Sequence, residues 1–164
     1  MLALYIEEYD LTPDEAYMRR ALIQAEKAAL LGEVPVGAVL VINGEIIAED
    51  HNRRETAHDS TAHAEMLVLR TASERLGRWR LSDADIFVTL EPCPMCAGAL
   101  VLARISRLVY GAVDSKAGAI ESLYRIAEDN RLNHRLKVVK GVLEKECSSF
   151  LRDFFKSRRS MEVL

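Results

Sequence analysis

The chain has 164 residues, of which 49% are hydrophobic and 29% are charged, and it contains eight glycines and four prolines. This composition excludes a disordered or fibrous protein and is typical of one globular domain, so we interpret residues 1–164 as a single domain. The formal net charge is −3. Dedicated nucleic-acid-binding domains are usually strongly basic, so a role of that kind would need basic residues gathered on one part of the surface.

Cysteine usage and the N-terminus bear on the cellular compartment. The three cysteines are an odd and low number, which argues against a secreted disulfide framework and for a reducing compartment. The first ten residues, MLALYIEEYD, lack the basic region of a signal peptide, and no apolar run approaches the length that spans a membrane. We therefore expect a cytoplasmic, soluble protein.

The first predicted elements are a helix and a hairpin. TPDE (12–15) is typical of a capped helix start with a capping box, and the helix should run to about Leu31. The apolar run VGAVLVI (36–42) ends in Asn-Gly (43–44) and is followed by EIIAE (45–49). This pattern predicts a β-hairpin with a two-residue turn.

Helices and strands then alternate to the end of the chain. The remaining predicted elements are a helix with apolar positions at Ala62, Met66, Leu69 and Leu76, a strand at 86–90, a helix at 93–104, a strand at 107–111, a helix around 122–128, a strand at 135–141 and a C-terminal helix at about 142–159. A hairpin followed by this alternation predicts an α/β fold, namely a single-domain three-layer α/β/α sandwich with a central five-stranded mixed sheet.

Two segments far apart in the sequence carry residues that zinc accepts as ligands. EPCPMC (91–96) places Cys93 and Cys96 at a predicted helix start, and TAHAEM (61–66) places His63 at another. One imidazole and two thiols leave the fourth tetrahedral position open, as in a catalytic rather than a structural site. The positive end of a helix also lowers thiol pKa values and favours the metal-binding thiolate.

Glu65 is the candidate general base beside this group. Residues i and i+2 do not share a face in the body of a helix, so His63 and Glu65 can converge only near the helix entrance. Taken alone, Cys93 and Cys96 could instead form a redox pair, or a closed structural site with Cys147. The His-x-Glu segment disfavours the redox pair, and Cys147 falls in an apolar helical stripe, where a buried inert cysteine is the better interpretation.

Together, HAE (63–65) and PCPMC (92–96) resemble the signature of the zinc deaminases that act on nucleobases and nucleosides. Other stretches are similar to the bacterial tRNA adenosine deaminases in particular: EVPVGAVLV (33–41), HNRRE (51–55), GAVDSKAG (111–118), NHR (133–135) and FFKSRR (154–159). The resemblance implies a cytidine deaminase-like fold, one zinc ion per chain and a homodimer.

The resemblance also implies hydrolytic deamination of adenosine to inosine at the wobble position of a tRNA anticodon, with the anticodon stem-loop as partner. The zinc would be held by His63, Cys93 and Cys96. Glu65 would deprotonate the attacking water and then deliver protons to N1 and to the departing ammonia. An anticodon loop suits this chemistry because its bases are already unpaired.

The residues that we expect to contact RNA are Asn52, Asp114, Lys116, Phe155, Arg158 and Arg159. By resemblance, Asn52 should hydrogen-bond the flipped base or its ribose, and the next two should contact the adjoining nucleotides. Phe155 and Arg159 are four apart and share one face of the last helix. We therefore expect the helix at about 142–159 to be an RNA-contacting extension of the domain, although Phe155 could equally lie at the edge of the core.

Two other functions fit parts of the sequence. A small-molecule deaminase of guanine, cytosine or a nucleotide would share the metal ligands and Glu65, but it would need neither Phe155 nor the terminal arginines. A non-catalytic, zinc-stabilised RNA-binding module would not need Glu65.

Overall fold

A computed structural model describes residues 11–161, so that the ends of the predicted domain, residues 1–10 and 162–164, lie outside the described residues. Its elements are α1 (Pro13–Leu30), β1 (Gly37–Ile42), β2 (Glu45–His51), α2 (Ala64–Leu76), β3 (Ala84–Leu90), α3 (Pro94–Leu102), β4 (Arg107–Ala112), the 3₁₀ turn η1 (Ile126–Glu128), β5 (Lys137–Lys140) and α4 (Glu144–Met161).

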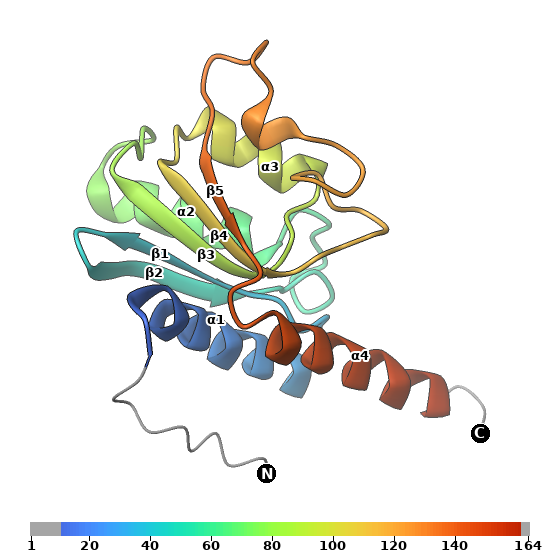
Figure 1. Ribbon diagram of the computed structural model, residues 1–164. Coiled ribbons are helices and arrows are strands. Elements are labelled where there is room, and N and C mark those ends of the chain that lie inside the picture. The colour runs from blue at the N-terminus through green and yellow to red at the C-terminus, as the bar shows by residue number, and fades with distance from the viewer. Residues whose placement is uncertain (1–10, 162–164) are drawn as a thin grey trace.

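The five strands form one mixed sheet in the order β2-β1-β3-β4-β5 (Figure 1). The strand β1 pairs antiparallel with β2 and β3, whereas β3, β4 and β5 run parallel. Helices α1 and α4 cover one face of the sheet, and α2 and α3 cover the other. The predicted three-layer sandwich with a five-stranded mixed sheet is therefore confirmed. Within the part of the chain that the structure describes, no helix is long and apolar enough to cross a bilayer.

Local sequence signals account for the start of α1 and for the hairpin. The Thr12 hydroxyl accepts a hydrogen bond from the Glu15 backbone N–H at 3.3 Å, and the Glu15 carboxylate accepts one from the Thr12 N–H at 2.8 Å. This is the predicted capping box. At the hairpin, Asn43 and Gly44 have φ values of 51° and 79°, as a type I′ turn requires.

The predicted helix around 122–128 is wrong. Only the 3₁₀ turn at Ile126–Glu128 forms in this region. The backbone N–H groups of Ile120, Glu121 and Ser122 donate to the side chain of Glu91, which lies far away in the sequence. An α-helix that starts at Ser122 would also pair the Ile126 N–H with the Ser122 carbonyl, but this N–H donates to the Ala119 carbonyl at 3.0 Å instead.

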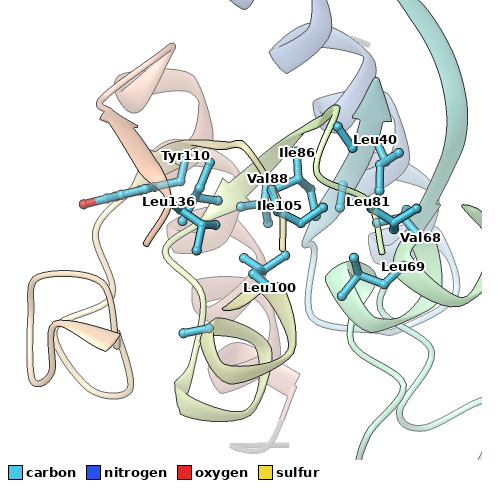
Figure 2. Close-up of a cluster of buried hydrophobic side chains, with 14 of the residues drawn as sticks. Leu40, Val68, Leu69, Leu81, Ile86, Val88, Leu100, Ile105, Tyr110 and Leu136 are labelled. Atoms are coloured by element: carbon cyan, nitrogen blue, oxygen red, sulfur yellow. The ribbon is translucent and has the colours of Figure 1, made fainter. Parts of the chain in front are cut away.

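The two faces of the sheet carry separate apolar cores. The larger core lies between the sheet and helices α2 and α3, and Figure 2 shows Val68 of α2 on the side of Leu40 of β1 and Leu100 of α3 on the side of Val88 of β3. The smaller core lies under α1 and α4 and includes Met18, Phe87 and Cys147. Because α2 and α3 are anchored by the larger core, the residues at their N-terminal ends are held at a defined place beside the sheet.

Candidate active site

The predicted metal ligands lie at the starts of two helices. Cys93 is the N-cap of α3, Pro94 follows in the first turn, and Cys96 is the third residue of the helix. His63 is the N-cap of α2. Strand β3 ends at Leu90, so the cysteines lie beyond its carboxyl end, where sites in α/β sheets commonly form.

These three side chains converge with a spacing that suits zinc. The His63 Nδ1 lies 3.7 Å from Sγ of Cys93 and 3.5 Å from Sγ of Cys96. Zinc–sulfur and zinc–nitrogen bonds at tetrahedral angles would place those atoms about 3.5 Å apart. No fourth His, Cys, Asp or Glu of residues 11–161 adds a ligand atom to the group. Cys147 is buried in the smaller core instead, as the apolar-stripe interpretation expects.

The two thiols of the group differ in proton affinity. A hydrogen bond from Cys96 lowers the pKa of Cys93 to about 4, and the same interaction together with burial raises the pKa of Cys96. The hydrogen bond to Cys93 raises the pKa of His63, against the opposing effect of burial. Both cysteines are free. The lowered pKa favours the thiolate form of Cys93, which is the form that binds zinc.

Glu65 is the second residue of α2, near the helix entrance, where His63 and Glu65 can face the same site. Its side chain is 4% exposed. Burial raises the pKa of Glu65 to about 7, and a hydrogen bond from its own backbone N–H offsets part of that effect. A carboxyl group that titrates near neutral pH can both accept and return a proton.

A pocket of about 750 Å³ opens over this group. Its floor contains the buried carboxylates Glu65 and Glu91. The pocket also has four exposed basic residues in its lining, which are Arg54, Lys116, Arg152 and Arg159. This is a local basic surface on a chain whose net charge is −3.

The structure brings five of the six expected RNA-contacting residues to the pocket, namely Asn52, Asp114, Lys116, Phe155 and Arg159. Phe155 is 45% exposed, so it is not simply a residue of the core edge. Arg158 is not in the pocket lining. Its guanidinium donates to the carbonyl of Gly32, just after α1, and stacks 4.8 Å from the ring centroid of Phe154.

Asn52 connects the pocket to the start of α2. Its side-chain oxygen accepts a hydrogen bond from the Ala64 backbone N–H at 3.0 Å, so it satisfies one of the donors that a helix start leaves without a partner. The amide nitrogen of Asn52 is not used in this bond. Because Ala64 lies between His63 and Glu65, Asn52 positions the two residues of α2 that face the site.

Comparison with known proteins identifies the family of the chain. The family model of MafB19-like deaminases matches residues 12–159. The chain is 55% identical over 149 residues to the tRNA-specific adenosine deaminase of Bacillus subtilis, covering 91% of this chain and 92% of that protein. The chain belongs to the tRNA-specific adenosine deaminase family. This confirms the resemblance seen in the sequence.

Solved structures support the assignment to the tRNA-specific adenosine deaminase family. One, from work on A-to-I editing by tRNA:A34 deaminases at the wobble position of transfer RNA, has a TM-score of 0.81 and 48% identity over 83% of this chain and 99% of its own. The guanine deaminase of Nitrosomonas europaea has a TM-score of 0.72 and 25% identity over 85% of this chain and 83% of its own. A fold that is shared with a guanine deaminase does not by itself select the substrate.

Three residues that line the pocket, Arg54, Glu91 and Arg152, and the loop-supporting Glu33 were not singled out from the sequence. Arg152 could have been found, because it precedes Phe155 by three positions and so shares its helical face. Arg54 carried no comparable signal, since it lies in a loop between β2 and α2. Glu33 and Glu91 lie in EVPVGAVLV and EPCPMC, but neither residue could be given a role, because the contacts that explain them involve distant backbone groups.

Glu33 supports the loop that carries Asn52 and Arg54 in this member of the tRNA-specific adenosine deaminase family. The carboxylate is 1% exposed and accepts hydrogen bonds from the N–H groups of Glu55 at 3.2 Å and Thr56 at 2.7 Å. Burial alone would raise the pKa of Glu33, but these hydrogen bonds outweigh it and lower the pKa below the usual 4.5. The charged form is thus favoured by folding.

We expect Glu33→Gln to lower the free energy of unfolding at pH 7 by about 1–3 kcal/mol, because an amide nitrogen would replace one of two buried acceptors. The folded-state pKa lies below the unfolded one, so this stabilisation is present above the usual value of 4.5 and is lost as the pH falls through the folded-state pKa. Urea unfolding of both proteins from pH 7 down to about pH 3 should show the gap closing. Glu26→Gln, at an exposed position, is the control. A difference in the free energy of unfolding between Glu33→Gln and wild type that does not change with pH would contradict the prediction.

Proposed function

We propose that this protein is a zinc-dependent deaminase that converts adenosine to inosine at the wobble position of a tRNA anticodon. The observation that carries the proposal is the convergence of His63, Cys93 and Cys96 beside the buried Glu65, at the floor of a pocket with basic residues in its lining. Membership of the tRNA-specific adenosine deaminase family supports the choice of substrate.

The residues of the site divide the chemistry between them. The geometry of His63, Cys93 and Cys96 fits a zinc ion, which when bound would act as a Lewis acid that activates water. Glu65 would take one proton from the attacking water and pass it to N1 of the base as the C6–O bond forms. It would then take the remaining hydroxyl proton and pass it to the amino group, so that the C6–N bond breaks and ammonia leaves. Asn52 has its side-chain oxygen committed to α2, so its amide nitrogen would donate to the flipped nucleoside.

The pocket lining supports RNA rather than a small molecule as substrate. Phosphate groups are neutralised by lysine and arginine, and four exposed residues of these types line the pocket: Arg54, Lys116, Arg152 and Arg159. Phe155 offers a half-exposed ring for stacking on an unpaired base. A small base that fits the pocket floor would need neither this ring nor these charges.

A direct assay tests the proposal. Metal-replete protein is incubated with an anticodon stem-loop that carries a wobble adenosine, and inosine is scored, with free guanine, cytosine and cytidine as competing substrates. We expect inosine at the wobble position and little turnover of the free bases. A stem-loop with its adenosine moved to another loop position serves as the control. Turnover of guanine without inosine formation would overturn the proposal in favour of a small-molecule deaminase.

The α4 extension can be tested separately. Arg159→Ala should weaken stem-loop binding and reduce the slope of log affinity against log salt by about 1, because one phosphate contact is lost. Lys145→Ala is the matched control, since Lys145 is an exposed cation of the same helix that does not line the pocket. Equal effects of the two changes on binding would show that Arg159 acts only through net charge.

We also infer that the protein is a homodimer, as family membership suggests. The outer side of α2 and α3 carries a shallow apolar depression lined by Leu69, Ala99, Leu102 and Trp79. Leu102 is 69% exposed and Trp79 is 60% exposed. Burial of such a patch favours association. Sedimentation of the purified protein at micromolar concentration should give the mass of two chains, and a monomer would contradict the inference.

A further inference from the structure

Glu91 is a buried acid in the pocket floor that has no part in the chemistry proposed so far. It follows β3 directly and precedes Cys93 by two positions. Its side chain is 2% exposed. Its backbone N–H donates to the Ala112 carbonyl at 2.8 Å, which extends the pairing of β3 with β4 by one step beyond the strand. This pairing therefore holds the backbone of Glu91 in place at the end of the sheet.

The Glu91 carboxylate collects five hydrogen bonds from the segment after β4. Oε1 accepts from the N–H groups of Ile120, Glu121 and Ser122, at 3.2, 2.8 and 2.9 Å. Oε2 accepts from the Asp114 N–H at 2.9 Å and from the Ser122 hydroxyl at 2.6 Å. Four of the five donors are backbone N–H groups, which cannot reverse their role. An acceptor-only side chain is therefore required at this position.

These bonds shape the wall of the pocket that Asp114 and Lys116 form. The Asp114 carboxylate accepts from the Lys116 N–H at 3.0 Å and from the Ala117 N–H at 3.2 Å, so the turn is rigid once Asp114 is placed. Asp114 in turn is placed by Glu91 Oε2. A series of hydrogen bonds thus connects the end of β3, beside the predicted metal ligands, to the residues that we expect to contact the adjoining nucleotides.

Gly118 gives a second observation that Glu91 and this wall are fitted to each other. A Cβ atom at position 118 would lie 2.3 Å from Cδ and from Oε2 of Glu91. Real Cβ contacts do not occur at such a distance, so only glycine lets the segment close over the carboxylate. The second glycine of GAVDSKAG is therefore required by two neighbours, the buried acid and the Asp114 carbonyl, which a Cβ at position 118 would approach to 2.5 Å.

We propose that Glu91 is a positioning residue for substrate binding, which acts through Asp114 and Lys116 and not on the metal group. This positioning role rests on the proposed function, because it takes the tRNA anticodon as the substrate. Removal of the Glu91 carboxylate should displace the wall formed by Asp114 and Lys116. Zinc binding and the chemical step should not change. The alternative is that Glu91 contributes to folding stability only.

Glu91→Gln separates these two roles. The amide can keep its oxygen on the three N–H groups at Oε1 and turn its nitrogen to Oε2, where the Ser122 hydroxyl can reverse and accept. The Asp114 N–H cannot reverse, so the Asp114 bond is lost selectively. We expect KM for the anticodon stem-loop to rise roughly tenfold, with kcat changed by less than about threefold and zinc content equal to that of wild type. Backbone amide hydrogen exchange of Asp114 should become faster.

Controls make each outcome decisive. Ser122→Ala removes only the hydroxyl and should leave KM near the wild-type value. Lys116→Ala in the wild-type and Glu91→Gln backgrounds should have non-additive effects on KM if Glu91 acts through Lys116. An unchanged KM, additive effects, or a loss of zinc in parallel with activity would overturn the positioning role.

If Glu91→Gln does not fold, Glu91→Asp carries the same test, because it keeps the negative charge but its shorter side chain withdraws that charge from the N–H groups of the loop. Wild-type protein that forms no inosine would instead contradict the proposed function, and the exchange measurement would still test Glu91.

Discussion

Glu65→Gln is expected to reduce inosine formation by about 10²–10⁴-fold, the usual contribution of a positioned general acid–base group. Glutamine has nearly the same shape, but it cannot take a proton from water or return one to the base. Because Glu65 is 4% exposed and is not one of the three converging ligand residues, the change should leave bound zinc unaltered. The free energy of unfolding should not fall, since a buried neutral amide costs less than a buried carboxylate.

The measurement is single-turnover inosine formation with saturating, metal-loaded protein, so that binding does not limit the rate. The exposed Glu74→Gln on the same helix is the matched control and should retain wild-type rates. Retention of the rate in Glu65→Gln would remove Glu65 from the chemistry. Intact RNA binding by a wild-type protein that forms no inosine would instead favour the non-catalytic zinc-stabilised module.

Cys96→Ser should abolish both zinc retention and deamination. A serine hydroxyl remains protonated near neutral pH and is a poor zinc ligand, whereas Cys96 supplies a sulfur 3.5 Å from His63 Nδ1. The loss of affinity should exceed the roughly 10–100-fold that follows from removing an outer-shell partner of a ligand. Added zinc should raise the unfolding temperature of the wild-type protein and leave that of Cys96→Ser almost unchanged.

Cys147→Ser is the control for this experiment, because Cys147 is also a buried thiol but belongs to the smaller core. It should keep one zinc ion per chain and wild-type inosine formation, with some loss of stability. Metal analysis after dialysis distinguishes the two variants. A Cys96→Ser protein that retains one equivalent of zinc would show that the three-residue ligand set is incorrect.

Where the structure depends on neighbours in the sequence, it could be predicted from the sequence. The capping box at Thr12 and Glu15 and the turn at Asn43-Gly44 are short-range interactions whose residue types are nearly sufficient to form them. The three residues of the candidate metal group could also be identified, because Pro94 marks a helix start beside Cys93. Apolar periodicity then gave the alternation of helices and strands, and from it the three-layer sandwich.

Long-range contacts decided the rest. The segment around 122–128 has helical residues, yet its start is bound to Glu91 after β3 and the Ile126 N–H donates to the Ala119 carbonyl, so the helix does not form. Arg158 and Arg159 are equivalent as sequence, but Arg158 binds the carbonyl of Gly32 while Arg159 lines the pocket.

The sequence by itself therefore determined the fold class, the candidate ligands and the candidate base, because local propensity and residue chemistry specify them. Only the tertiary structure decided which polar groups satisfy each other across the chain. Buried donors and acceptors must find partners, and which partners they find depends on where distant segments meet.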